Sequence, residues 1–325
     1  MTNQNNCGGT AGGYPTVKDI EQRTLGKSSW TEASQVEAPV AISVVMPAYN
    51  EAAMVGAQIE TVRDVMERAG YPYELIVVDD GSEDETANIV RQHDVLLISK
   101  KYNRGYGAAL KTGIAAAKHD WILIIDADGT YPSESIPHLL AALPDYDMVV
   151  AARIGKSVHI PLVRRPMKWV LGRLANYLAG QPIPDLNSGL RVFRKSLAEK
   201  FEHLLPSGFS FTSTITMSLL LNDYRVLYLP IDYHKRVGLS KVRALHVYDF
   251  LLVILRTAIY FNPLRFFLPL GAVFFVGGLG KLGYDVWRWK FSPNGGLLIV
   301  AALIIWTLGL LSDQISRIAV SSKAK

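Results

Sequence analysis

Short apolar runs recur between residues 41 and 151, and segments with helical spacing separate them. The predicted strands are 41–46, 74–78, 95–98, 121–125 and 148–151. The predicted helices are a stretch after Pro47 that stops at Gly70, one that starts at a Ser82–Glu85 capping box, 106–117 and 135–143. Continuous apolar strands separated by helices indicate a mostly parallel sheet covered on both faces. The sequence therefore predicts a doubly wound α/β, Rossmann-like nucleotide-binding domain.

Polar side chains follow four of these strands, where ligands bind in such sheets. They are Asn50 and Glu51, Asp79 and Asp80, Asn103 and Arg104, and Asp126 and Asp128. The chain has no Gly-x4-Gly-Lys-Ser/Thr loop, and the third glycine of a dinucleotide fingerprint is absent after Gly105 and Gly107. A P-loop ATPase and a Rossmann dehydrogenase therefore lose support.

Asp126 and Asp128 limit the ligand that this edge can hold. Two carboxylates repel an anion unless a divalent cation lies between them. Carboxylate oxygens suit Mg²⁺ or Mn²⁺. A diphosphate bridged by one of these metals fits the pattern.

Two apolar stretches, 266–284 and 295–311, lie near the C-terminus. A membrane-spanning helix needs about 20 residues, with about 17 as the lower limit. The intervening residues 285–294 predict a short turn, hence a transmembrane hairpin. Basic residues on its outer flanks outnumber those in the turn, which predicts both ends in the cytoplasm. The flanking residues are Arg256, Arg265, Arg317, Lys323 and Lys325, and the turn residues are Arg288 and Lys290. A hairpin buried in a soluble core is the alternative.

Charge divides the chain of 325 residues, although the total is only +5. Residues 1–152 carry a net charge of −10, residues 153–265 carry +11, and residues 266–325 carry +4. A basic segment can bind nucleic acid or anionic lipid headgroups. The predicted membrane hairpin favours the lipid, so no nucleic-acid partner is predicted. The single cysteine, Cys7, excludes an internal disulfide.

The predicted organisation has six parts. A polar, Gly-rich tail covers 1–38, the nucleotide-binding half 39–152 and the acceptor-binding half 153–243. An interfacial helix covers 244–265, because its many apolar residues include Asp249 and Arg256. The hairpin (266–311) and a cytoplasmic tail (312–325) follow.

Six motifs in order resemble those of family 2 glycosyltransferases, which have the GT-A fold. They are Pro47-Ala-Tyr49-Asn50-Glu51, Asp79-Asp80-Gly81-Ser82-x-Asp84-x-Thr86, Asn103-x-Gly105-x-Gly107, Asp126-Ala-Asp128, Asp185-x-x-Ser188-Gly189-Leu190-Arg191 and Arg236-Val-Gly238-Leu-Ser240-Lys241. The last two are similar to motifs of dolichyl-phosphate mannose synthases and bacterial polyprenyl-phosphate glycosyltransferases.

The resemblance implies roles on the donor side. Residues that match nucleotide-sugar contacts are Pro47, Tyr49, Glu51, Asp79, Asp80, Gly105, Asp126, Ala127 and Asp128. Asp126 and Asp128 match the metal-holding Asp-x-Asp pair. Thr130 stands where related enzymes often have a glutamine that contacts the metal.

The resemblance also implies an acceptor side built for a lipid phosphate. Arg153, Lys168, Arg236 and Ser240 match acceptor-phosphate positions, and Asp185 and Arg191 match positions near the reacting centre. The implied partners are a nucleoside-diphosphate sugar such as UDP-glucose or GDP-mannose, a polyprenyl phosphate and the membrane, with a homo-oligomer left open. The implied function is inverting, metal-dependent transfer of one hexose at the cytoplasmic face of the plasma or inner membrane.

Other functions remain open at this stage. A processive polysaccharide synthase is disfavoured, because Arg288-Trp289 lacks the glutamine of a Gln-x-x-Arg-Trp motif. A membrane-anchored transferase with a different glycan or lipid acceptor, and a non-catalytic membrane-tethered binding protein, are the alternatives.

Overall fold

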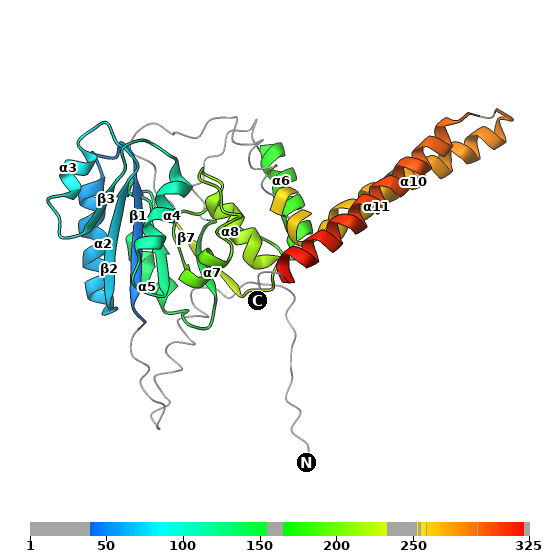
Figure 1. Ribbon diagram of the computed structural model, residues 1–325. Coiled ribbons are helices and arrows are strands. Elements are labelled where there is room, and N and C mark those ends of the chain that lie inside the picture. The colour runs from blue at the N-terminus through cyan, green and yellow to red at the C-terminus, as the bar shows by residue number, and fades with distance from the viewer. Residues whose placement is uncertain are drawn as a thin grey trace, which may run out of the picture.

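The computed structural model describes residues 40–154, 165–232, 252, 255–257, 259–290 and 292–321. Its centre is a seven-stranded sheet in the order β3-β2-β1-β4-β6-β5-β7 (Figure 1). The strands are β1 (Ile42–Ala48), β2 (Tyr73–Asp79), β3 (Leu96–Ser99), β4 (Trp121–Ile124), β5 (Met148–Arg153), β6 (Arg191–Arg194) and β7 (Val226–Ile231). All five predicted strands are therefore confirmed.

Helices cover both faces of the sheet. Those of the sheet domain are α2 (Val55–Ala69), α3 (Thr86–Val90), α4 (Tyr106–Ala116), the 3₁₀ turn η1 (Ser133–Ser135), α5 (Ile136–Leu140), α6 (Arg165–Ala179), α7 (Lys195–Lys200) and α8 (Phe211–Leu220). The α2 helix ends as predicted at Gly70, whose φ of 71° is the left-handed conformation that glycine adopts without strain.

Alternation along each strand divides the core into two layers. On one face, α2 and α5 pack against residues such as Val44 and Val77. On the other face, α4, α7 and α8 pack against Val45 and Val78. Every residue of β1 is buried, as expected of a strand covered on both sides. The predicted doubly wound, mostly parallel fold is confirmed.

The β6 strand runs antiparallel to both of its neighbours. It pairs with β4 on one side and β5 on the other, and Arg191 lies opposite Ile124 and Val150. Because β6 is reversed, its beginning lies at the edge where its neighbours end. The segment before β6 is thereby brought to the predicted ligand edge.

Two long helices, α10 (Pro263–Trp287) and α11 (Asn294–Ser321), form an arm that extends away from the sheet domain (Figure 1). Both contain a stretch long and apolar enough to cross a membrane: Pro263–Trp287, with a mean hydropathy of 1.6, and Asn294–Ile318, with 2.2. Glycines allow the helices to approach closely. A Cβ on Gly271 would lie 2.3 Å from Trp306 Nε1, and one on Gly278 would lie 2.7 Å from Ile299 Cγ1.

Polar contacts attach the base of this hairpin to the sheet domain. Arg265 Nη1 donates to the Leu178 carbonyl at 3.0 Å, and Tyr177 Oη donates to the Arg265 carbonyl at 3.2 Å. Ser316 Oγ, near the end of α11, donates to the Tyr260 carbonyl. The start of α10 therefore contacts the sheet domain, and the end of α11 is bonded to the segment just before α10.

Two local predictions differ from the structure. The Ser82–Glu85 capping box is wrong, because α3 begins at Thr86 without a side-chain cap, and Ser82 Oγ instead accepts a bond from the Asn50 amide at 2.9 Å. The hairpin helices are also longer than predicted. An ion pair one helical turn apart lies in the polar part of each helix. Lys281 pairs with Asp285 in α10, and Asp313 pairs with Arg317 in α11.

Candidate active site

The ends of the strands bring the predicted site residues to one edge of the sheet. Asp126 and Asp128 follow β4, while Arg153 is the last residue of β5. The segment Asp185–Arg191 reaches the same edge because β6 is antiparallel. Donor and acceptor motifs that lie about 60 residues apart in the sequence therefore become neighbours.

The loops after β1 and β2 are bonded to each other. Asn50 has a φ of 51°, a left-handed conformation that asparagine tolerates. Its amide donates to Ser82 Oγ, and its Oδ1 accepts from the Glu83 amide at 2.8 Å. The Glu51 amide donates to Thr86 Oγ1 at 2.9 Å. The predicted nucleotide-binding loop that carries Tyr49 and Glu51 is thus held by the loop after the next strand.

Asp79 and Asp80 are buried, each with 3% of its surface exposed. Asp79 Oδ1 accepts from the Ser82 amide at 3.0 Å. Asp80 Oδ2 accepts from the amides of Arg104 and Gly105 at 3.1 and 2.7 Å, and its Oδ1 lies 3.2 Å from Lys100 Nζ. Both carboxylates shape the surrounding loops. Their contact with a nucleoside stays a prediction.

The two glycines of the Gly105-Tyr106-Gly107 motif make room for another part of the chain. A Cβ on Gly105 would lie 2.6 Å from the Ser207 carbonyl oxygen, and one on Gly107 would lie 2.2 Å from the Pro206 carbonyl oxygen. The ring of Tyr106 stacks on Phe209, with the ring centroids 5.8 Å apart. The motif therefore positions Tyr106 at the start of α4.

Asp126 has close contacts on two sides. Tyr106 Oη donates to its Oδ1 at 2.9 Å. On the other side a Cβ on Gly189 would lie 2.3 Å from Oδ2, so only glycine fits against this carboxylate. Burial comes first among the causes that raise the pKa of Tyr106 well above its usual value, and the charge of Asp126 adds to it. Tyr106 is therefore a protonated donor that orients Asp126.

Asp128 is largely buried and is held by Thr130. Its Oδ1 accepts from the Thr130 amide at 3.1 Å and from Thr130 Oγ1 at 2.6 Å. The threonine that replaces the expected glutamine thus orients the second carboxylate. Within the described residues, no three His, Cys, Asp or Glu side chains are grouped to hold a metal. Asp126 and Asp128 provide two carboxylates, so a cation bound to this pair would take further ligands from diphosphate or water.

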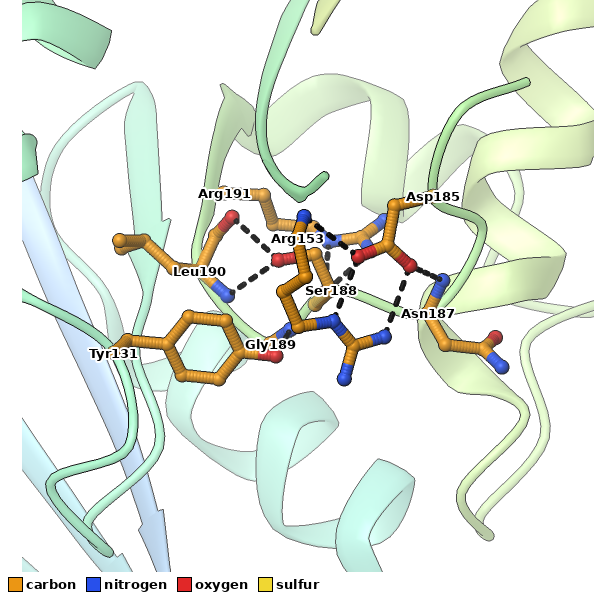
Figure 2. Close-up of polar contacts among 8 residues, drawn as sticks. All are labelled: Tyr131, Arg153, Asp185, Asn187, Ser188, Gly189, Leu190 and Arg191. Carbon is orange, nitrogen blue, oxygen red and sulfur yellow. Dashed lines mark hydrogen bonds and ion pairs between the residues drawn. The ribbon is translucent and has the colours of Figure 1, made fainter. Parts of the chain in front are cut away.

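Arg153 and Asp185 form a bidentate ion pair (Figure 2). Arg153 Nε donates to Asp185 Oδ2 at 2.7 Å, and Nη2 donates to Oδ1 at 2.9 Å. The amides of Arg153 and Asn187 each donate to the same carboxylate at 3.1 Å. Burial favours the neutral acid, but the bonds and charge of Arg153 outweigh it and hold the pKa of Asp185 below its ordinary value.

Arg191 is completely buried. Its guanidinium donates to the carbonyls of Ser188 and Thr212 and to Thr216 Oγ1, the last at 2.8 Å. Burial lowers the pKa of Arg191 from its ordinary value. The side chain joins the segment before β6 to α8. We therefore propose that Arg191 influences the reaction through the residues that it holds in place.

Several predicted acceptor residues fall on parts of the chain that the structure does not describe. Arg236, Ser240 and the side chain of Lys168 lie outside the described residues, as do the 1–38 tail and half of the residues of the predicted 244–265 helix. Conversely, the sequence alone indicated no role for Tyr106 or Tyr131. Tyr106 lies between the two glycines of its motif, and this position could have marked it as a site residue in the sequence. Tyr131 forms a bond that only the tertiary structure discloses.

Two family models match the chain. The model for glycosyl transferase family 2 matches residues 43–201, which include both carboxylates and the Arg153–Asp185 pair. The model for the GtrB C-terminal hairpin matches residues 262–318. The fold, the site and these matches define a membrane-associated sugar transferase. Residues 43–201 form a family 2 glycosyltransferase domain, as the sequence motifs predicted.

A curated relative and solved structures extend this assignment. A dolichyl-phosphate hexose transferase from Haloferax volcanii is 29% identical over 203 residues, covering 62% of this chain and 86% of the relative. Mannosyl-3-phosphoglycerate synthase from Rubrobacter xylanophilus is 20% identical, with a TM-score of 0.54 over 74% of this chain and 76% of its own. Glucosyl-3-phosphoglycerate synthase from Mycobacterium tuberculosis, solved with Mn²⁺, UDP and phosphoglyceric acid, is 19% identical, with a TM-score of 0.55 over 77% of this chain and 84% of its own. These structural similarities confirm the GT-A fold.

Proposed function

We propose that this glycosyltransferase moves a single hexose from a nucleoside-diphosphate sugar to a polyprenyl phosphate, with inversion, at the cytoplasmic face of a membrane. The observation that carries the proposal is the position of Arg153, a cation for an acceptor phosphate, at the same edge as Asp126 and Asp128. The base of the membrane hairpin contacts the same domain through Arg265. The relative from Haloferax volcanii, named as a dolichyl-phosphate hexose transferase, supports this choice of acceptor.

On the donor side, Asp126 and Asp128 are proposed to hold Mg²⁺ or Mn²⁺ with the diphosphate. Their hard oxygen atoms and their fixed orientations suit such an ion. When bound, the metal would neutralise the charge that develops on the departing nucleoside diphosphate. Pro47, Tyr49, Glu51, Asp79, Asp80, Gly105 and Ala127 are the proposed surroundings of the nucleotide.

On the acceptor side, Arg153 is proposed to bind the lipid phosphate, with Lys168, Arg236 and Ser240 as further contacts. Two donors of the Arg153 guanidinium are bonded to Asp185, which fixes the plane in which its other N–H groups point. Asp185 is a poor general base because its pKa is lowered. A phosphate monoester is already anionic near neutral pH, so it needs no strong base to attack.

The proposed reaction is a single in-line displacement. An oxygen of the acceptor phosphate forms a bond to the anomeric carbon as the bond from that carbon to the diphosphate breaks. The anomeric configuration therefore inverts. Alignment of the two reactants and stabilisation of charge supply the acceleration.

The test is transfer of radiolabel from UDP- and GDP-sugars into organic-extractable lipid, using the full chain, short-chain polyprenyl phosphate and Mn²⁺ or Mg²⁺. We expect label in the lipid with one donor and none after addition of EDTA. Label found only in free sugar, in a water-soluble polymer or in a different lipid would contradict the proposed acceptor.

Asp128→Asn tests the donor carboxylates. The amide oxygen retains an acceptor for Thr130, so the loop should persist while one negative charge disappears. We expect transfer to fall by about 100-fold or more, the scale of losing a group that stabilises transition-state charge. Asp120→Asn, just before β4 at the opposite edge of the sheet, is the matched control and should retain activity. Full activity in Asp128→Asn would refute the metal assignment.

A further inference from the structure

Tyr131 connects the donor and acceptor motifs. It lies three residues after Asp128 and only 3% of its surface is exposed. Its hydroxyl oxygen accepts a hydrogen bond from the Gly189 amide at 2.6 Å (Figure 2). Gly189 belongs to the segment Asp185–Arg191, 58 residues further along the chain. One tyrosine thus bonds the loop of the donor carboxylates to the segment that holds Arg153.

Gly189 has a second contact with the donor loop. A Cβ on this residue would lie 2.3 Å from Asp126 Oδ2 and 2.7 Å from its Cγ. The backbone of Gly189 therefore packs directly against the Asp126 carboxylate. The Gly189 amide is also bonded to the Tyr131 hydroxyl. Gly189 therefore contacts both ends of the loop from Asp126 to Tyr131.

The rest of the acceptor segment is held just as tightly. Asp185 bonds Arg153 through both carboxylate oxygens, and the Asn187 amide folds back onto Asp185. The buried Arg191 guanidinium bonds the Ser188 carbonyl, next to Gly189. Tyr131 is therefore linked to Arg153 through the Gly189 amide, the backbone of residues 187–189 and the Asp185 carboxylate. A shift of Gly189 would move the guanidinium proposed to bind phosphate.

We propose that Tyr131 is a positioning residue, whose hydroxyl bond to Gly189 sets the separation between the Asp126–Asp128 pair and the Arg153–Asp185 pair. This inference rests on the proposed function, because it concerns the alignment of an acceptor phosphate with the sugar donor. In-line displacement is sensitive to this alignment, and a misplacement of about 1 Å can cost about 100-fold in rate. Tyr131 touches neither reactant in this scheme.

Tyr131→Phe removes the hydroxyl and keeps the ring. We expect kcat for transfer to fall about 10-fold, with KM for the donor and for the lipid changed by less than about two-fold, because alignment and not affinity is lost. Tyr73→Phe, at the start of β2 on the opposite edge of the sheet, is the matched control and should retain kcat. An unchanged kcat in Tyr131→Phe, or a loss confined to KM, would overturn the inference.

A second measurement does not depend on the acceptor. Amide hydrogen exchange of the peptide containing residues 185–191 is followed in the full chain, with and without Mn²⁺ and UDP or GDP. We expect nucleotide to slow exchange in the unmodified chain but not in Tyr131→Phe. Equal slowing in both proteins overturns the role of Tyr131. If the unmodified chain transfers no sugar to polyprenyl phosphate, the proposed function fails, while this exchange measurement still decides the role of Tyr131.

Gly189→Ala supplies an independent variant if Tyr131→Phe folds poorly. Its methyl group would collide with Asp126 and push the two loops apart while leaving the Tyr131 hydroxyl in place. We expect the same loss of kcat with little change in KM for the lipid. Unchanged kcat in Gly189→Ala would show that the separation of the two pairs does not limit transfer, and would overturn the inference.

Discussion

Replacing Asp185 by asparagine should weaken transfer by disturbing Arg153. The carboxylate accepts four hydrogen bonds, from Arg153 N, Nε and Nη2 and from the Asn187 amide. A side-chain amide has only one oxygen, and its NH₂ group must face donors. In either orientation, the substituted side chain loses two of the four bonds, one of them from the guanidinium.

The expected size of the effect follows from these bonds. A hydrogen bond to a charged group is worth roughly 1.5–3 kcal/mol. The Arg153 side chain is 26% exposed, so water replaces part of the loss. About 2 kcal/mol remains, which corresponds to roughly a 30-fold reduction in kcat/KM for polyprenyl phosphate. KM for the sugar donor should change little, because Asp185 lies on the acceptor side.

A matched pair at the other end of β5 supplies the control. Asp147 Oδ1 lies 3.7 Å from Arg194 Nε, and Asp147 Oδ2 accepts from the Arg225 amide at 2.9 Å. Asp147→Asn should therefore affect stability alone. Steady-state kinetics of lipid transfer distinguishes the two variants. Equal kcat/KM for Asp185→Asn and the unmodified chain would refute the orienting role.

The pH profile separates this orienting role from general-base catalysis. The lowered pKa keeps Asp185 ionised throughout the neutral range. Its contribution to stability is present above the ordinary aspartate pKa, near 3.9, and is lost as pH falls through the lower folded-state value. An acid limb of kcat/KM near pH 6 should instead come from the second ionisation of the acceptor phosphate, whose pKa is about 6. This limb should persist in Asp185→Asn, and its disappearance would identify Asp185 as the base.

Two further predictions concern packing. Gly113→Ala would place a Cβ 2.4 Å from Val45 Cγ1, so we expect the free energy of unfolding to fall by about 1–3 kcal/mol, measured by denaturant titration. No change would contradict the close packing of α4 on the sheet. Gly278→Leu would drive a side chain into Ile299 of α11, whereas Gly277→Leu meets open space. Thermal unfolding in detergent should be lowered by the first substitution only, and equal melting temperatures would contradict the hairpin packing.

Much of the framework could be predicted from local sequence. Apolar runs identified the five strands of the first half because a buried strand needs apolar side chains on both faces. Polar residues after those strands predicted the edge where the candidate site residues gather, because parallel strands end together. The charge-free stretch 295–311 identified a hairpin helix because its length matches a bilayer. These properties depend on residues close together in the chain.

Tertiary structure decided how the two halves of the site meet. The reversal of β6 brings Gly189 beside Asp126 and Asp185 to the same edge of the sheet, although no local pattern encodes strand order or direction. The Tyr131–Gly189 bond joins residues 58 positions apart, and Arg191, a residue type that is usually exposed, is fully buried against α8. The sequence by itself determined which strands, helices and ionisable groups the chain has. Only the folded chain decided which groups touch, because pairing across the sheet depends on packing between distant segments and not on the periodicity of any one of them.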